Sequence, residues 1–162
     1  MIADETIAGA GSTDALQLRI EAIEASLSNQ AAITAEQMGN ELVAVGERVL
    51  ETWLEARGIR PSYDRVEGFR LLALHRQGAK GDPSFNACRE SCRELIYQTN
   101  CALAADSPEE TIRHLRLASM VAHHLTLFIS GKLQEAGLGD FCCSSRPMRL
   151  RNDQDSAQES LE

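Results

Sequence analysis

The sequence predicts an all-α protein, a helical bundle of four main helices with a short N-terminal helix and a disordered C-terminal tail. Aromatic residues are sparse, at 4%, whereas residues that favour helices, such as Ala, Leu, Glu, Gln and Arg, are common. Apolar residues recur every three or four positions in several long segments, and capping residues or Gly and Pro separate these segments. The length of 162 residues favours one domain. We expect a flexible N-terminus at 1–12, a bundle domain at 13–141 and a disordered tail at 144–162.

The first two helices are predicted by their apolar spacing. In the first, the stripe contains Leu16, Ile20, Ile23 and Leu27. Thr34 and Gln37 form a capping-box pattern that starts the second helix, and Gly58 is suited to end it. This helix has two neighbouring stripes, one with Met38, Leu42, Val45, Val49, Trp53 and Ala56, the other with Val43, Leu50 and Leu54. A face this wide indicates burial against more than one neighbour.

Two further helices are predicted in the middle of the chain. Pro61 and Ser62 restart the chain, and the spacing of Tyr63, Val66, Phe69 and Ala73 places them on one helical face. After a Gly-rich break, Asp82 and Pro83 begin the next helix, which we expect to reach about Ala105. Its apolar stripe contains Phe85, Cys88, Cys92, Leu95, Thr99 and Leu103.

The last helix has the clearest start in the chain. Ser107 is a capping residue, Pro108 takes the first helical position, and two glutamates follow where the helix dipole favours anions. Its main stripe contains Leu115, Ala118, Ala122, Leu125, Ile129 and Leu133, and a second stripe contains Leu117, Val121, His124 and Phe128. Gly137 and Gly139 end the helix, and the polar, aperiodic sequence after Cys143 predicts the disordered tail.

Charge and composition exclude several classes of partner. The formal net charge of −8 argues against nucleic acid, whose phosphates require clustered Lys and Arg, and against an anionic membrane surface. The N-terminal residues include acids and lack the apolar core of a signal peptide, and His123 and His124 interrupt the most apolar segment. We therefore expect a cytoplasmic protein with reduced cysteines. The low number of lysines, Lys80 and Lys132 only, suggests a GC-rich bacterial genome.

Cys88 and Cys92 are the most informative pair of side chains. Their four-residue spacing on the apolar stripe predicts that both thiols point into the core, where free cysteine packs like a small hydrophobe. On this interpretation no cofactor is expected. The alternative is a soft-metal site for Zn or Cu(I), in which the two thiolates are joined by His124, and by His123 as a further ligand. Cys142 and Cys143 are adjacent near Arg146, and we interpret them as one packed and one exposed thiol.

Patterns typical of bundle enzymes are missing from the sequence. None of the four histidines has Glu three residues before it, as di-iron bundles require, and there is no Gly-rich phosphate loop or nucleophile elbow. We therefore favour a role that is not enzymatic. An enzyme would have to use Glu67, His75 and the pair His123 and His124. Glu67 lies near an apolar face, and Arg113 or Arg116 would be its ion-pair partner on this hypothesis.

The preferred hypothesis for function is protein–protein interaction. The second and last helices each have two apolar stripes and the N-terminal helix has one, which is more apolar surface than a four-helix core covers. We expect an accessory or regulatory protein that binds a protein partner or forms a homodimer. A metal- or cofactor-binding bundle that uses Cys88, Cys92 and His124 is the alternative.

Overall fold

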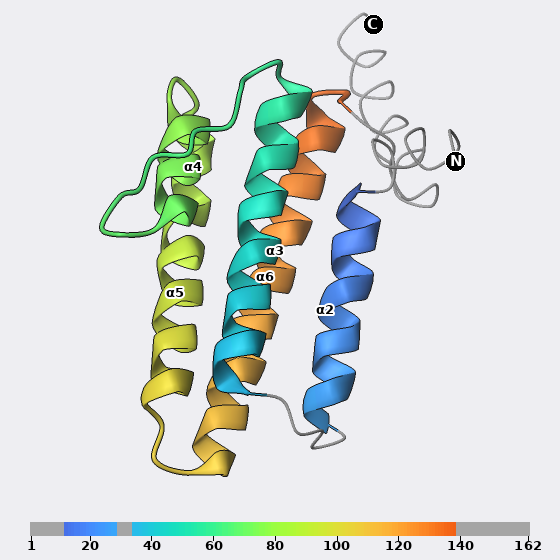
Figure 1. Ribbon diagram of the computed structural model, residues 1–162. Coiled ribbons are helices and arrows are strands. Elements are labelled where there is room, and N and C mark those ends of the chain that lie inside the picture. Colours follow the sequence, from blue (N-terminus) through green and yellow to red (C-terminus); the bar gives the residue numbers. More distant parts are fainter. Residues whose placement is uncertain (1–11, 29–33, 139–162) are drawn as a thin grey trace, which may run out of the picture.

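The computed structural model describes residues 12–28 and 34–138, and in these ranges the protein is all-α (Figure 1). The prediction of an all-α fold is confirmed, and the described ranges contain no β-strand. No helix in the described part of the chain is long and apolar enough to cross a membrane. The predicted flexible N-terminus, apart from Ser12, which begins α2, lies outside the described residues, as do the predicted tail and Cys142 and Cys143. The elements are α2 (Ser12–Ser28), α3 (Ala35–Ala56), α4 (Arg70–Ala79), the 3-10 helix η1 (Pro83–Cys88), α5 (Arg89–Ala104) and α6 (Pro108–Glu135).

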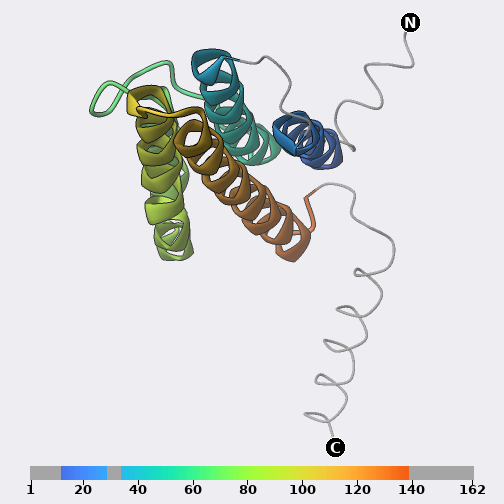
Figure 2. The same ribbon diagram turned by 90° about the horizontal axis from the view of Figure 1, so that it is seen from below.

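Helices α3 and α6 lie at the centre of the arrangement. Figure 2 shows them between α2 on one side and α5 on the other. Helix α6 packs against α2, α3 and α5, and α3 additionally contacts α4, which lies beside the start of α5. The buried apolar residues of these helices form one hydrophobic core.

The helix ends have the physical causes that the sequence predicts. The Thr34 Oγ1 accepts a hydrogen bond from the Gln37 N–H at 3.2 Å and caps α3. The Ser107 Oγ caps α6 in the same way, by accepting from the Glu110 N–H at 3.2 Å. Gly58 after α3 has a positive φ of 72°, which a glycine adopts without steric cost.

The predicted helix around Tyr63–Ala73 is wrong in its first half, because α4 begins only at Arg70. Val66 and Phe69 exchange two backbone hydrogen bonds, of 3.1 and 2.9 Å, across a two-residue turn. Both turn residues, Glu67 and Gly68, have positive φ, of 54° and 86°. Two consecutive residues in this conformation make a hairpin-type turn and cannot continue a helix. The side chain of Tyr63 is consequently exposed.

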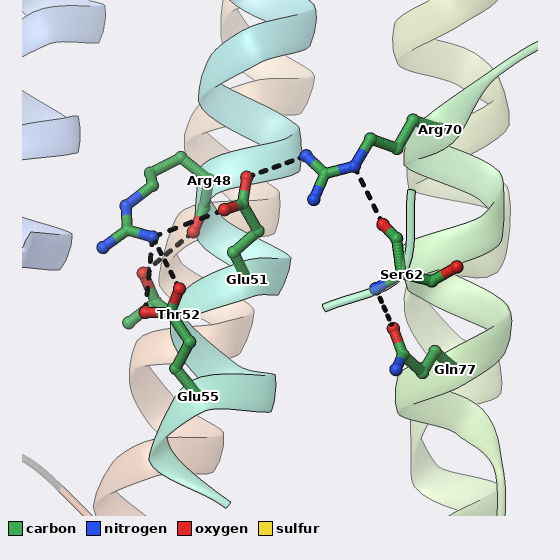
Figure 3. Close-up of polar contacts among 7 residues, drawn as sticks. All are labelled: Arg48, Glu51, Thr52, Glu55, Ser62, Arg70 and Gln77. Atoms are coloured by element: carbon green, nitrogen blue, oxygen red, sulfur yellow. Dashed lines mark hydrogen bonds and ion pairs between the residues drawn. The ribbon is translucent and has the colours of Figure 1, made fainter. Parts of the chain in front are cut away.

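Polar contacts hold the segment before α4 against α3 and α4 (Figure 3). The Ser62 N–H donates to the Gln77 Oε1 at 2.9 Å, and the Ser62 carbonyl accepts from the Arg70 Nε at 2.9 Å. The same guanidinium pairs with the Glu51 carboxylate of α3 at 3.0 Å. Arg70 therefore joins three parts of the chain and fixes the start of α4 beside α3.

The N-terminal helix docks on the rest of the molecule. Its predicted apolar stripe, Leu16, Ile20, Ile23 and Leu27, is buried, and α2 contacts α3 and α6. On the α6 side, the buried Ser119 hydroxyl donates to the Glu24 Oε1 at 2.9 Å. On the α3 side, a hollow of about 660 Å³ lies along the seam between Ile23 and Met38.

An aromatic cluster joins η1 to α3, α4 and α6. Phe85 of η1 is completely buried, and its ring centroid lies 5.6 Å from that of Trp53 on α3. The rings of His75 on α4 and Phe128 on α6 lie 5.9 and 6.0 Å from it. The Lys132 ammonium lies 5.5 Å from the Phe85 centroid. A single side chain thus packs elements from four separate parts of the sequence against one another.

Candidate functional site

Cys88 and Cys92 point into the core, as the sequence predicts. Cys88 is the last residue of η1, Cys92 lies in the first turn of α5, and both side chains are buried. The Cys88 thiol donates a hydrogen bond to the Phe85 carbonyl at 3.2 Å. The stripe does not extend to the end of the helix, because Leu103 in its last turn is exposed.

His75 joins the thiol pair from a neighbouring helix. Its Nε2 lies 2.8 Å from the same Phe85 carbonyl that accepts from Cys88, and the imidazole is buried. Sequence reasoning does not pair His75 with the cysteines, because the contact depends on how α4 packs on η1. The signal available in the sequence is that His75 ends the apolar run of residues 71–75, all of which are buried.

Cys88, Cys92 and His75 change one another's pKa values. A hydrogen bond from the Cys92 thiol lowers the pKa of Cys88 to about 6, with a further contribution from His75 and against the effect of burial. The same hydrogen bond, together with burial, raises the pKa of Cys92. Burial lowers the pKa of His75, but hydrogen bonds with Cys88 and the Phe85 carbonyl outweigh it and raise that pKa overall. Near neutral pH the arrangement therefore favours a Cys88 thiolate beside a neutral Cys92, and only the protonated Cys88 thiol donates to the Phe85 carbonyl.

A thiolate titration measures this arrangement directly. We expect the ultraviolet absorbance of the Cys88 thiolate, taken as the difference from Cys88→Ser protein, to appear with a midpoint near pH 6. Cys92→Ala removes the donor with the largest effect, so the midpoint moves up towards the ordinary value of 9.0. Cys92→Ser keeps a donor and is the matched control with a low midpoint. A wild-type midpoint near 9.0, or one that Cys92→Ala leaves in place, would contradict the assignment.

The histidines proposed as metal ligands do not accompany the thiols. His124 is exposed on α6, contrary to the expectation that it reaches inward, and His123 is half-buried. Within residues 12–28 and 34–138, no group of three or more His, Cys, Asp or Glu side chains is placed to hold a metal ion. The two cysteines remain the candidate ligands, and the described residues supply no third ligand to complete a Zn or Cu(I) site.

A basic pocket of about 450 Å³ opens beside the thiol pair, between α4, η1 and α5. His75 forms part of its inner wall, and Val66, Leu72 and Ala79 supply apolar wall. Four cationic side chains line it and no carboxylate does: Arg76, Lys80, Arg89 and Arg93. Sequence reasoning missed this pocket, although its cations form two pairs at i and i+4.

Glu67 lies near the basic pocket on the turn before α4. Its carboxylate pairs with Arg93 at 2.9 Å, and its side chain is 57% exposed. The expected partners Arg113 and Arg116 are therefore wrong. Of the groups that an enzyme would have to use, His75 lines the basic pocket and Glu67 pairs with an arginine of it, whereas His123 and His124 lie on α6 and do not line it.

A second candidate site is the side of α6 that faces away from α3, α2 and α5. Leu117, Met120 and Leu127 are exposed there at 38%, 63% and 51%, with the exposed His124 between the last two. We call these four residues the outer stripe. The predicted second stripe of this helix is only half right, because its other members, Val121 and Phe128, pack partly against the core.

No known protein family matches this chain, and no similar protein is found among the curated proteins or the solved structures.

Proposed function

We propose that the protein acts by protein–protein interaction, as a homodimer formed through the outer stripe of α6. The observation that carries the proposal is the line of large apolar side chains, Leu117, Met120 and Leu127, exposed on one helix. Apolar side chains lined up in this way are typical of interaction sites. An accessory or regulatory role, without catalysis, agrees with such a surface.

The apolar surface predicted to be in surplus is concentrated at this place. The stripe of α2 is buried, and the stripes of α3 are largely buried against α2, α4, α5 and α6. Helix α6 packs on three neighbours with its main stripe, which leaves the outer stripe facing solvent. Exposed apolar side chains on other elements, such as Leu18 of α2, occur singly and need no partner.

The spacing of the outer stripe favours a second copy of the chain as its occupant. Residues 117, 120, 124 and 127 follow one another in steps of three, four and three, which is the seam along which two helices pack. When two copies of α6 cross antiparallel about a twofold axis, Leu117 of one copy meets Leu127 of the other, twice. The stripe is therefore complementary to itself, as a twofold interface requires.

The interface is short, so we expect weak affinity. Each large apolar side chain contributes about 1.5–3 kcal/mol when it is fully buried, and these are already partly covered. Association costs several kcal/mol in translational and rotational freedom. The difference is a few kcal/mol, which corresponds to a dissociation constant on the order of 0.1–1 mM.

Leu127→Glu is expected to abolish the dimer, because a carboxylate would be buried without a partner in both copies. Sedimentation equilibrium at protein concentrations up to about 1 mM, which covers the expected dissociation constant, measures the effect. Leu18→Glu is the matched control, since Leu18 is 65% exposed on α2, outside the outer stripe, and the dimer should persist. A wild-type protein that stays monomeric, or a dimer that tolerates Leu127→Glu, would overturn the proposal.

A further inference from the structure

We propose that the basic pocket between α4, η1 and α5 binds a small phosphomonoester. The pocket volume of about 450 Å³ lies within the range of small-molecule sites. Its wall combines cationic side chains with apolar patches from Val66, Leu72 and Ala79. A ligand that fits both features has an anionic group and an apolar organic part.

The charge of the pocket is opposite to that of the molecule. The chain has a net charge of −8, yet four of its sixteen Lys and Arg residues line this one pocket, with no carboxylate among them. No ion pair within the described residues engages Arg76, Lys80 or Arg89. These three side chains therefore lack an ion-pair partner among residues 12–28 and 34–138.

The cations are spaced in a way that disfavours the empty pocket. Arg89 and Arg93 lie four residues apart at the start of α5, and Arg76 lies in the last turn of α4, which Lys80 follows in an extended conformation. Like charges at this spacing destabilise a helix by about 0.2–0.5 kcal/mol a pair. Arg89 also lies at the helix N-terminus, where the dipole disfavours cations. A bound anion removes both penalties.

The number and type of cations favour phosphate over carboxylate. Guanidinium groups form paired hydrogen bonds with phosphate oxygens, and three of the four cations are arginines. A phosphomonoester carries a charge of about −1.5 to −2 at neutral pH, whereas a carboxylate carries one charge and has two oxygens. Four cations around one pocket match the phosphate group more closely.

Glu67 acts as an internal counter-ion that competes with the ligand. Its carboxylate holds Arg93 at 2.9 Å from a turn residue with a φ of 54°, a conformation that non-glycine residues rarely adopt. An incoming phosphate must share Arg93 with this carboxylate or displace it. Glu67→Gln removes the competing charge and leaves the cationic lining intact, so this substitution should strengthen binding.

Titration with phenyl phosphate, followed by calorimetry on the full chain, tests the proposal. We expect saturable binding of one molecule per chain, tighter than that of inorganic phosphate or benzoate at equal ionic strength. Arg89→Gln and Arg76→Gln should each weaken binding about tenfold, which is the effect of one lost charge-assisted hydrogen bond. Glu67→Gln should strengthen it about two- to fivefold, since exposed ion pairs contribute up to about 1 kcal/mol.

Arg116→Gln is the matched control, because Arg116 is an exposed arginine of α6 outside the pocket. This variant should bind phenyl phosphate as tightly as the wild type does. The side chains that are replaced, those of Glu67, Arg76, Arg89 and Arg116, are all exposed. Melting curves verify that each variant is folded. Absence of saturable binding, equal weakening by Arg116→Gln, or benzoate binding as tight as that of phenyl phosphate would each overturn the assignment.

Discussion

Phe85→Ala is expected to lower the free energy of unfolding by about 3–5 kcal/mol, the largest effect of any single substitution considered for this protein. The ring is completely buried and lies within 6.0 Å, between centroids, of Trp53, His75 and Phe128. A Cβ placed on Gly78 would come within 2.6 Å of the Phe85 ring, so the space around the ring is tightly filled. Its removal leaves a cavity at the point where α3, α4, η1 and α6 meet.

Urea denaturation followed by circular dichroism measures this loss, and Phe85→Leu is the matched control. Leucine keeps most of the buried volume, so we expect it to cost less than half as much as alanine. A cost below about 1 kcal/mol for Phe85→Ala would show that the surrounding helices close the cavity by moving together.

Gly46→Val is expected to destabilise the protein by about 3 kcal/mol, at the upper end of the range for overpacked cores. Gly46 lies on α3 where α4, α5 and α6 approach. A Cβ there would lie 2.9 Å from Leu95 Cδ2, 3.2 Å from Leu71 Cδ1 and 3.7 Å from Leu125 Cδ2. Valine adds two further methyl groups, and three leucines on three helices would have to move together.

Gly131→Val on α6 separates this packing effect from helix propensity. A Cβ on Gly131 meets no atom within 4 Å, so the same substitution should change stability by less than about 0.5 kcal/mol. Thermal melting of both variants gives the comparison. If the two glycines respond equally, close helix packing is not the reason for glycine at position 46.

The sequence predicts the helices well where their causes are local. The caps at Thr34 and Ser107 and the stripes of α2 and α6 depend on residues within one or two turns, so spacing alone finds them. The start of α4 was missed because Tyr63, Val66 and Phe69 satisfy helical spacing equally well in a non-helical chain. What decides the matter is the turn at Glu67 and Gly68, supported by contacts from Ser62 and Arg70 to other helices.

In the candidate sites too, the features with local causes can be predicted from the sequence, and those that depend on helix packing cannot. The inward direction of Cys88 and Cys92 follows from helical spacing and was predicted correctly. The approach of His75 was not, because it depends on how α4 packs against η1. The basic pocket combines two like-charged pairs from separate segments, and only the four-residue spacing within each pair, Arg76 with Lys80 and Arg89 with Arg93, signals it in the sequence.

The hollow along the seam between α2 and α3 has a consequence for how the molecule opens. The contacts of α3 with α5 and α6 do not involve α2, which packs on α3 and α6. Release of α2 would break the hydrogen bond from Ser119 to Glu24 and leave the aromatic cluster untouched. We therefore expect detachment of the first helix, with the remainder still native, to be the opening motion of lowest free energy.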